Sequence, residues 1–386
     1  MRKTLPTMIA TLAIIVTPTN AFASPSITPA RVSPTQAPAG HASEAHGRVP
    51  FTSAKVEKSE NRWMVSWQAS GVRRVDVFAG DSPDDTSTYV GSGRGTASLT
   101  VTDPTGVAHP YFTLVPDHGR SLLVADRKLP FEGVPNFRDV GGYRATDGKW
   151  VRMGLLYRSS VLTLTPSDLA TVQNDLDIRH VYDLRSPAEI SATPDVIPSN
   201  VSYVDYNVIA ALSTSTPPQP VPPTNLTEDA AYLDWGYTLQ MTAAPARQNW
   251  HDLFTSLAVA SGPSIIHCNG GQDRTGLATA LLLSILDVPW TTVQSDYELT
   301  FKYLAGSELQ AASFASMPPA QRQLAEYTQS HPEWMVQRLD AAFAAIHQQY
   351  GSIQNYAING LGLTPSTLMK LRAKYLVGPG TGKPAA

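Results

Sequence analysis

Apolar and polar residues alternate in short runs through the first third of the chain. In the clearest run, residues 62–67, the side chains of Trp63, Val65 and Trp67 occupy every second position. About seven such runs lie between residues 49 and 128, separated by clusters of Gly, Asp, Ser and Pro. A period of two is typical of strands that bury one face, and strands at this spacing favour an antiparallel sandwich. We therefore predict a small all-β sandwich of fibronectin or immunoglobulin type over residues 49–128, with Trp67 in its core.

From about residue 129 the pattern changes to apolar strands that alternate with helical periodicity. Short apolar runs predict strands at 151–157, 178–184, 201–206 and 264–267. Apolar residues spaced by three and four predict helices at about 229–243, 246–259, 275–286, 291–304, 333–349 and 365–376. A further helix is expected after Thr165, because Thr165, Pro166 and Asp168 form the pattern of a capping box. The alternation predicts an α/β domain over residues 129–378, with a mostly parallel sheet flanked by helices.

Four segments fit neither pattern. Residues 1–23 combine Arg2 and Lys3 with a short apolar core and a small-residue site at 21–23, which is typical of a secretory signal peptide. We expect a disordered linker at 24–48, an irregular insertion at 212–228 and a disordered tail at 379–386. No apolar run reaches the roughly 20 residues that a membrane-spanning helix needs. The sequence therefore predicts a secreted or periplasmic protein without a membrane span.

Charge and cysteine usage narrow the classes of function. The formal charge is -3, and it becomes -5 without residues 1–23, which carry two basic residues and no acidic one. A mildly acidic chain without a long basic run does not indicate binding to nucleic acid. The single cysteine, Cys268, can form no disulfide within the chain. A lone cysteine is usually a small buried apolar residue, but a free thiol in an oxidising compartment is a liability unless the protein uses it.

The surroundings of Cys268 indicate how the thiol is used. Residues 267–276 read His-Cys-Asn-Gly-Gly-Gln-Asp-Arg-Thr-Gly, between the apolar stretch 263–266 and the helical pattern 277–286. A strand, a tight glycine loop and a helix N-terminus direct backbone N–H groups at one point and form an anion site. These donors favour the thiolate of Cys268, and the planar fork of Arg274 suits two oxygens of a phosphate. We therefore predict transfer of a phosphoryl group onto sulfur, with phosphate bound by Asn269, Gly270, Gly271, Gln272 and Arg274.

These residues resemble the signature of cysteine-dependent protein tyrosine phosphatases, and the longer string resembles that of the bacterial exported tyrosine phosphatases. Blocks that match the same group in the same order are Asn136 to Tyr143, Arg158 to Ser160, Asp183 to Arg185 with Glu189, and Asp296-Tyr297. The resemblance covers about residues 130–376. It implies a protein-tyrosine-phosphatase without metal or cofactor, acting on phosphorylated proteins or small phosphomonoesters. The group often has lysine where this chain has Gln272, and the loss of that charge argues against phosphoinositide substrates.

Roles follow for the individual residues. Cys268 is the expected nucleophile and Arg274 the clamp on the equatorial oxygens. A general acid must protonate the leaving oxygen; Asp273 is the first candidate, and Asp205, at the end of a strand, is the second. His267 is expected to orient the loop, and Thr275 could donate to the sulfur. We expect ion pairs beneath or beside the loop from Arg138, Asp139, Asp183 and Arg185.

Three other functions remain open at this point. A phosphoinositide or inositol polyphosphate phosphatase would share the chemistry and differ only in substrate. A non-catalytic protein that binds phosphorylated ligands would usually lack Cys268 or Arg274, and both are present. A sulfur-transfer enzyme of rhodanese type also has a cysteine loop, but the Arg-Thr-Gly sequence that leads into a helix favours the phosphatase.

Overall fold

The computed structural model describes residues 48–378, except 103, 108, 132, 213, 214 and 216–224. These described residues belong to one compact unit. The predicted signal peptide, nearly all of the predicted linker, most of the 212–228 insertion and the predicted tail lie outside them. Among the described helices, none has the length and apolar character needed to cross a bilayer.

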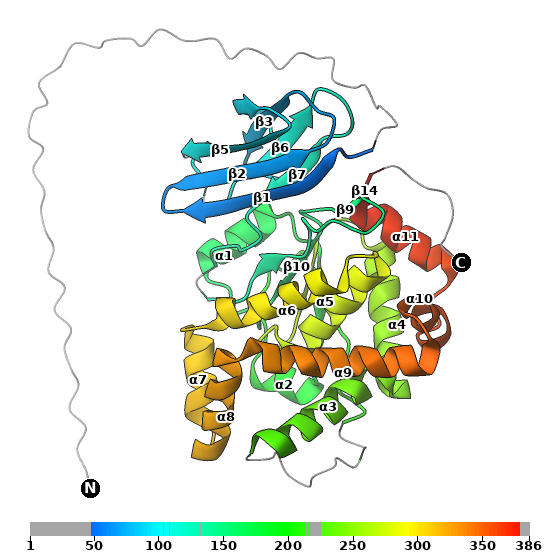
Figure 1. The fold of residues 1–386 in the computed structure, drawn as a ribbon. Coiled ribbons are helices and arrows are strands. Elements are labelled where there is room, and N and C mark those ends of the chain that lie inside the picture. The colour runs from blue at the N-terminus through cyan, green and yellow to red at the C-terminus, as the bar shows by residue number, and fades with distance from the viewer. Residues whose placement is uncertain are drawn as a thin grey trace, which may run out of the picture. The chain divides into compact units, whose positions relative to one another are not determined.

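Residues 51–125 form seven strands in two antiparallel sheets, as the alternating pattern predicts (Figure 1). One sheet has the order β1-β2-β5 and the other the order β4-β3-β6-β7. Their bounds are β1 (Phe51–Ser59), β2 (Arg62–Ala69), β3 (Val75–Gly80), β4 (Thr88–Gly93), β5 (Thr96–Thr102), β6 (Tyr111–Pro116) and β7 (Leu122–Ala125). Trp67 is buried among the side chains of both sheets, and its Nε1 donates to the carbonyl of Arg94 at 2.9 Å.

The second half is an α/β fold around a five-stranded mixed sheet with the order β12-β11-β13-β10-β8. Four strands are parallel: β10 (Leu156–Ser159), β11 (His180–Asp183), β12 (Ser202–Asp205) and β13 (Ser264–His267). Strand β8 (Arg138–Asp139) pairs antiparallel with β10 at the edge. Parallel strands end at the same edge of a sheet, so the residues that follow β10, β11 and β13 lie close together.

The single strand predicted at 151–157 is wrong. The chain forms β9 (Trp150–Val151), which pairs antiparallel with β14 (Leu376–Val377), and then turns before it enters β10. The turn contains Gly154 at φ 79°, where a Cβ atom would lie 2.5 Å from Cγ of Pro83. Apolar residues on both sides of this turn gave the appearance of one continuous strand.

All six predicted helices are present: α3 (Leu226–Thr242), α4 (Ala244–Val259), α5 (Asp273–Ile285), α6 (Trp290–Leu304), α9 (Pro332–Tyr350) and α11 (Pro365–Tyr375). Helix α1 (Pro166–Ala170) begins with the predicted capping box at Thr165. The sequence pattern missed α2 (Pro187–Ala192), α7 (Glu308–Ser316), α8 (Pro319–Ser330) and the short α10 (Ile353–Asn355). Because α3 begins at Leu226, the last residues of the predicted irregular insertion are helical.

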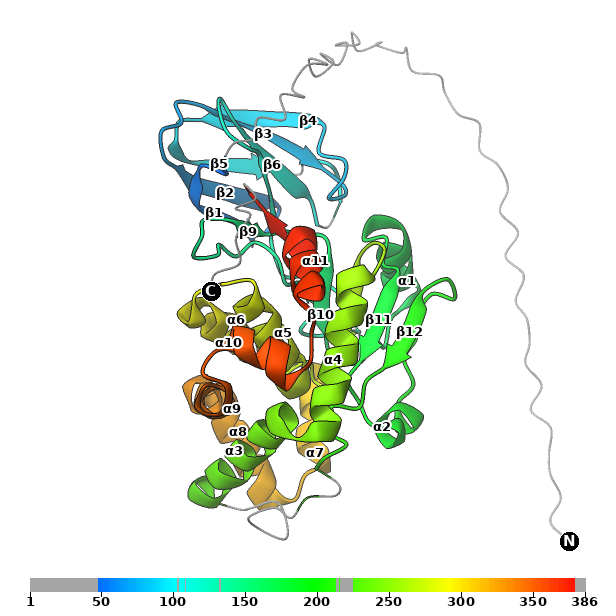
Figure 2. The ribbon, with the colours of Figure 1, turned by 90° about the vertical axis from the view of Figure 1, so that its right-hand side faces the viewer.

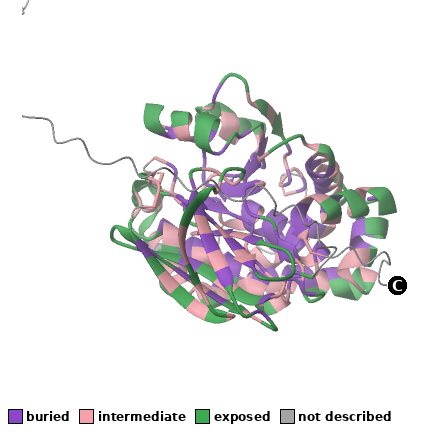
Figure 3. Cartoon of the chain, turned by 90° about the horizontal axis from the view of Figure 1, so that it is seen from above, coloured by how far each residue is buried: buried purple, intermediate pink, exposed green. Residues whose placement is uncertain are grey.

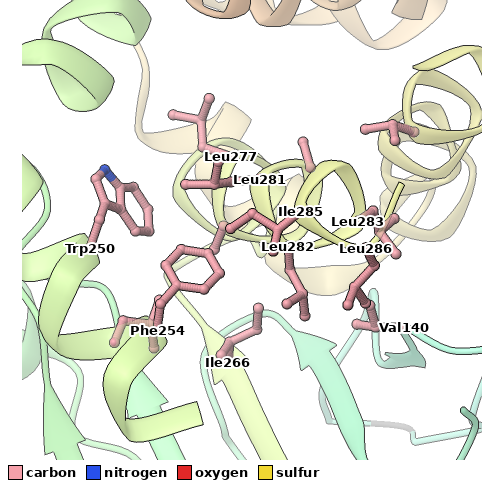
Figure 4. Close-up of a cluster of buried hydrophobic side chains, with 14 of the residues drawn as sticks. Val140, Trp250, Phe254, Ile266, Leu277, Leu281, Leu282, Leu283, Ile285 and Leu286 are labelled. Atoms are coloured by element: carbon pink, nitrogen blue, oxygen red, sulfur yellow. The ribbon is translucent and has the colours of Figure 1, made fainter. Parts of the chain in front are cut away.

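Helix α5 lies at the centre of the core. Its apolar side chains form one buried cluster with Trp250 and Phe254 of α4 and Ile266 of β13, and Figure 4 shows these residues together. Figure 2 shows α4 and α11 side by side next to the sheet, and Figure 3 shows buried residues gathered in the interior. Since α5 is apolar on nearly every side, its packing fixes the position of its N-terminus, which follows β13 after a short loop.

We expect Leu281→Ala to lower the free energy of unfolding by about 2–5 kcal/mol, because Leu281 is fully buried in this cluster and alanine leaves a cavity. Met369→Ala is the matched control, because Met369 is an apolar side chain that is 62% exposed. Urea unfolding of both variants measures the difference. Equal losses would contradict the central position of α5.

Candidate active site

The cysteine loop connects the end of β13 at His267 to the start of α5 at Asp273. Cys268 is 2% exposed and is a free thiol. Within the described part of the chain, the backbone N–H groups of residues 269–272 have no protein acceptor. Free N–H groups beside a helix N-terminus are the arrangement that binds anions, and here they lie in the loop where the sequence predicts a phosphate site.

Two buried side chains turn the loop carbonyls away from this anion site. Arg158 Nη2 donates to the carbonyl of Gly271 at 2.7 Å, and Asn136 Nδ2 donates to the carbonyls of Gly270 and Gly271 at 3.1 and 3.0 Å. In a trans peptide, the C=O and the following N–H point in opposite directions. The N–H groups of Gly271 and Gln272 therefore point away from Asn136 and Arg158.

Glycine is required at position 271. Its φ is 64°, and a Cβ atom would lie 2.2 Å from the carbonyl oxygen of Ser159. Any other residue would combine a strained backbone with a direct clash against β10. The predicted role of Gly271 in permitting a tight loop therefore has both a conformational and a steric basis.

Asp296 of α6 holds the two arginines beneath the loop. It accepts from Arg158 Nη1 at 2.8 Å, from Arg138 Nε at 3.3 Å and from the hydroxyl of Tyr143 at 2.9 Å. Asp296 and both arginines are buried. Burial acts to raise the pKa of Asp296, but the charges of Arg138 and Arg158 outweigh it and lower this pKa to about 2.

Glu189 of α2 holds the predicted phosphate clamp. Its two oxygens each accept from one arm of the Arg274 fork at 2.8 Å, and Oε1 also accepts from Asn269 Nδ2 at 2.7 Å. Burial disfavours the charge on both partners, yet their pairing lowers the pKa of Glu189, and Cys268 together with Glu189 raises that of Arg274. In the sequence, Glu189 lies in a block that matches the family, but the sequence alone predicts no role for it. Ser186 followed by Glu189 is a capping-box pattern, which could have indicated a helix that begins here and presents Glu189.

The structure separates the two candidate acids. Asp273 starts α5 beside the loop, and its Oδ1 accepts from the hydroxyl of Tyr237 and from Gln272 Nε2 at 3.4 Å. Asp205 is exposed at the end of β12, and β11 lies between β12 and the β13 strand that carries the loop. At about 4.8 Å per strand, Asp205 is roughly 10 Å from the loop strand. Asp273 is thus the candidate that the fold places at the site.

His267 lies in a buried cluster behind the loop. Its Nδ1 is 3.3 Å from the carbonyl oxygen of Cys268, and its Nε2 is 3.5 Å from Oδ2 of Asp195, a residue that the sequence did not single out. Burial lowers the pKa of His267, although Asp183 and Asp195 act in the opposite direction. The contact with the Cys268 carbonyl joins the ring to the loop backbone, and the orienting role of His267 stays a prediction.

The same cluster contains the one group of possible metal ligands found among the described residues: Asp183, Asp195 and His267, with ligand atoms within 4.8 Å of one another. Arg185 Nη2 already lies 2.7 Å from Asp183 and 2.5 Å from Asp195. The guanidinium therefore supplies the positive charge between these carboxylates. The expected ion pair between Asp183 and Arg185 is present.

One supporting residue, Asp139, differs from the expectation. Asp139 has no ion pair within the described ranges; instead its oxygens accept the backbone N–H groups of Gly141 and Gly154, each at 2.6 Å. Burial raises the pKa of Asp139 to about 7. Asp139 therefore fixes the turn before β10 and does not support the cysteine loop. Thr275 Oγ1 is buried and, within the described part of the chain, lacks a hydrogen-bond partner, so it is free to donate at the start of α5.

A strand, a thiol loop with free N–H groups, and an arginine at the start of the next helix together define a phosphatase with a cysteine signature loop. Residues 129–377 match the model of the tyrosine phosphatase family, which is more than half of the chain, and the chain belongs to that family. It is a protein-tyrosine phosphatase, and therefore a hydrolase.

Similar proteins with assigned names are also phosphatases. A Cupriavidus necator protein, named as a candidate tyrosine-protein phosphatase, is 29% identical over 65% of this chain and 89% of its own length. A tyrosine-protein phosphatase of Nostoc commune is 25% identical over 55% of this chain and 70% of its own length. The triple specificity protein phosphatase PtpB of Mycobacterium tuberculosis is 27% identical over 66% of this chain and its full length. Among solved structures, P. aeruginosa TpbA is 16% identical over 45% of this chain and 94% of its own, with a TM-score of 0.20.

We expect Asp296→Asn to lower the free energy of unfolding by about 3–5 kcal/mol at pH 7, because it leaves two buried arginines without their carboxylate. The pKa of Asp296 is about 2 in the fold, below the roughly 3.9 of an unfolded aspartate. The stabilisation is therefore present above about pH 4 and is lost as the pH falls through 2. Urea unfolding from pH 7 to pH 2 should show wild type and variant converging. Asp177→Asn, which removes an exposed pair with Arg179, is the control and should show no such convergence.

Glu189→Gln should lower kcat/KM roughly tenfold to hundredfold, since charge-assisted hydrogen bonds of this kind contribute about 1.5–3 kcal/mol. Glutamine can still accept from the backbone N–H of Ser186, so α2 should remain folded. Steady-state rates on p-nitrophenyl phosphate measure the effect, and Glu308→Gln on exposed α7 is the control. Unchanged kinetics in Glu189→Gln would mean that Arg274 finds its position without this carboxylate.

Proposed function

We propose that this enzyme hydrolyses phosphate monoesters, chiefly phosphotyrosine in proteins, through a phosphocysteine intermediate on Cys268. The observation that carries the proposal is that Cys268 begins a loop whose N–H groups have no acceptor among the described residues, close enough to Arg274 for their charges to interact. A thiolate there can attack phosphorus in line, while these donors bind the three equatorial oxygens, over which charge spreads in the transition state.

One residue, Asp273, transfers the proton in both steps of the reaction. In the first step the Cys268 sulfur bonds to phosphorus, the bond from phosphorus to the ester oxygen breaks, and Asp273 gives its proton to that oxygen. In the second step water attacks the phosphocysteine, Asp273 takes a proton from this water, and sulfur leaves as thiolate. The position of Asp273 at the start of α5, adjacent in sequence to Arg274, supports its assignment as the general acid.

Burial of the thiol supports an aryl phosphate as the substrate. Because Cys268 is 2% exposed, the phosphate must enter the loop while the rest of the substrate stays outside. The long ring of phosphotyrosine suits this depth better than a short serine side chain. Phosphoinositides receive less support, because Gln272 is neutral and Arg274 is already paired with Glu189.

The enzyme is proposed to act outside the cytoplasm. The support is the signal-like composition of residues 1–23. We also propose that the two antiparallel sheets of residues 51–125 form a sandwich of fibronectin or immunoglobulin type, since they share one buried cluster. In the described residues of these sheets we find no group that contributes to the cysteine loop.

We expect Cys268→Ser to abolish turnover, because a serine hydroxyl is a far poorer nucleophile at neutral pH. Acid quenching during turnover should trap wild-type enzyme that is heavier by one phosphoryl group, as measured by intact-protein mass spectrometry. The chain has a single cysteine, so the loss of a thiol-linked phosphoryl group in Cys268→Ser assigns its position directly.

A serine variant with near wild-type rates would refute the covalent mechanism. Peptides that carry phosphotyrosine or phosphoserine, and a phosphoinositide, compared on the wild type, would test the substrate class. Preference for the lipid would exclude phosphotyrosine as the chief substrate.

A further inference from the structure

We propose that Tyr237 of α3 positions Asp273 for proton transfer, with Tyr297 of α6 behind it, so that one carboxyl oxygen is held and the other faces the leaving group. This inference rests on the proposed function, in which Asp273 is the general acid. Neither tyrosine lies in the cysteine loop, and Tyr237 belongs to no matching block in the sequence.

The three groups form a continuous chain of hydrogen bonds. The hydroxyl of Tyr237 donates to Oδ1 of Asp273, and the hydroxyls of Tyr237 and Tyr297 are 2.6 Å apart. A hydroxyl carries one proton, so Tyr237 can donate to Asp273 only if Tyr297 donates to Tyr237. The chain is therefore directed from Tyr297 through Tyr237 to the carboxylate.

Only one of the two carboxyl oxygens of Asp273 is engaged. Oδ1 accepts from Tyr237 and from Gln272, whereas Oδ2 has no hydrogen-bond partner among the described residues. Asp273 is only partly buried, and it begins α5 directly after the loop. When the acid is protonated, its proton therefore belongs on Oδ2, and fixing Oδ1 fixes the direction in which that proton is given.

The tyrosines also favour the product of proton transfer. When Asp273 loses its proton in the first step, the hydroxyl of Tyr237 donates a hydrogen bond to the new carboxylate and stabilises it. Tyr237 and Tyr297 are 2% and 1% exposed. Burial, followed by the charge of Asp273, holds the pKa of each well above its usual range, so both hydroxyls keep their protons and remain donors around neutral pH.

The close approach of Tyr297 to helix α5 depends on Gly276. A Cβ atom at Gly276 would lie 2.6 Å from the ring of Tyr297, so only glycine lets this ring pack against the first turn of α5. Gly276 is the last residue of the signature string in the sequence. The same string therefore supplies the nucleophile, the acid and the space for the tyrosine that supports the acid.

The test exploits the dependence of acid catalysis on the leaving group. p-Nitrophenolate leaves readily without protonation, whereas phenolate needs the proton, so loss of acid function slows phenyl phosphate much more than p-nitrophenyl phosphate. The value of kcat/KM reports only steps up to formation of the phosphoenzyme. We compare it for the two substrates in wild type, Tyr237→Phe, Tyr297→Phe and Asp273→Asn.

We expect Tyr237→Phe to lower kcat/KM for phenyl phosphate roughly tenfold to hundredfold, with a much smaller loss on p-nitrophenyl phosphate. Tyr297→Phe should show the same selectivity with a smaller loss, because it removes only the outer member of the chain. Tyr206→Phe is the matched control: its hydroxyl bonds to Ser256, away from Asp273, and it should leave both substrates unchanged.

Each other outcome identifies which idea fails. If Tyr237→Phe slows both substrates equally, or neither, the positioning role is wrong, and a lowered melting temperature with equal losses would assign Tyr237 to packing alone. If Asp273→Asn slows both equally, the acid assignment of the proposed function is wrong. If wild type turns over neither substrate, the proposed function itself fails.

Discussion

The active site depends on a buried ion cluster in which one carboxylate, Asp296, serves two arginines. Arg138 and Arg158 are fully buried, and neither would be tolerated there without that charge. Arg158 also reaches the carbonyl of Gly271, so the cluster fixes the orientation of the loop peptides. With two cations for one anion, the cluster retains positive charge directly beneath the proposed phosphate site. Burial and the neighbouring Arg138 lower the pKa of Arg158 to about 10, while negative charge at Asp296 and Cys268 favours its ionised form.

Helix α6 contributes to both sides of the site through two consecutive residues. Asp296 reaches the arginines under the loop, and Tyr297 reaches the hydroxyl of Tyr237 beside Asp273. Consecutive residues of a helix point about 100° apart, so one helix can serve both places only if it packs closely on α5. The contact between Gly276 and Tyr297 provides that close packing.

Local sequence patterns predicted what is local in the structure. The cysteine loop, the strand before it and the capping box at Thr165 depend on neighbours in the chain, and each was found where expected. Asp195 and Tyr237 reach the site from distant segments, and no pattern around them indicates this role. Helix α7 was missed because it buries no side chain completely, and α8 was missed because most of its residues are polar.

The errors have physical causes of the same kind. Asp139 was expected to take part in an ion pair beneath or beside the loop. In the fold its neighbour Arg138 points to Asp296, and Asp139 binds backbone N–H groups instead. Which side of a strand a charged residue faces depends on the sheet, and β8 has only two residues from which to infer it.

Helix α2 shows how a local fold and a distant charge depend on each other. It has six residues, too few to be stable alone in water. Oε2 of Glu189 accepts from the backbone N–H of Ser186 at 2.9 Å and also from Arg274 at 2.8 Å. The same atom therefore closes the first turn of α2 and aligns the arginine. Local unfolding of α2 would release Arg274 while the core around α5 stayed folded. The order of this short helix and the catalytic activity of the enzyme are therefore gained or lost together.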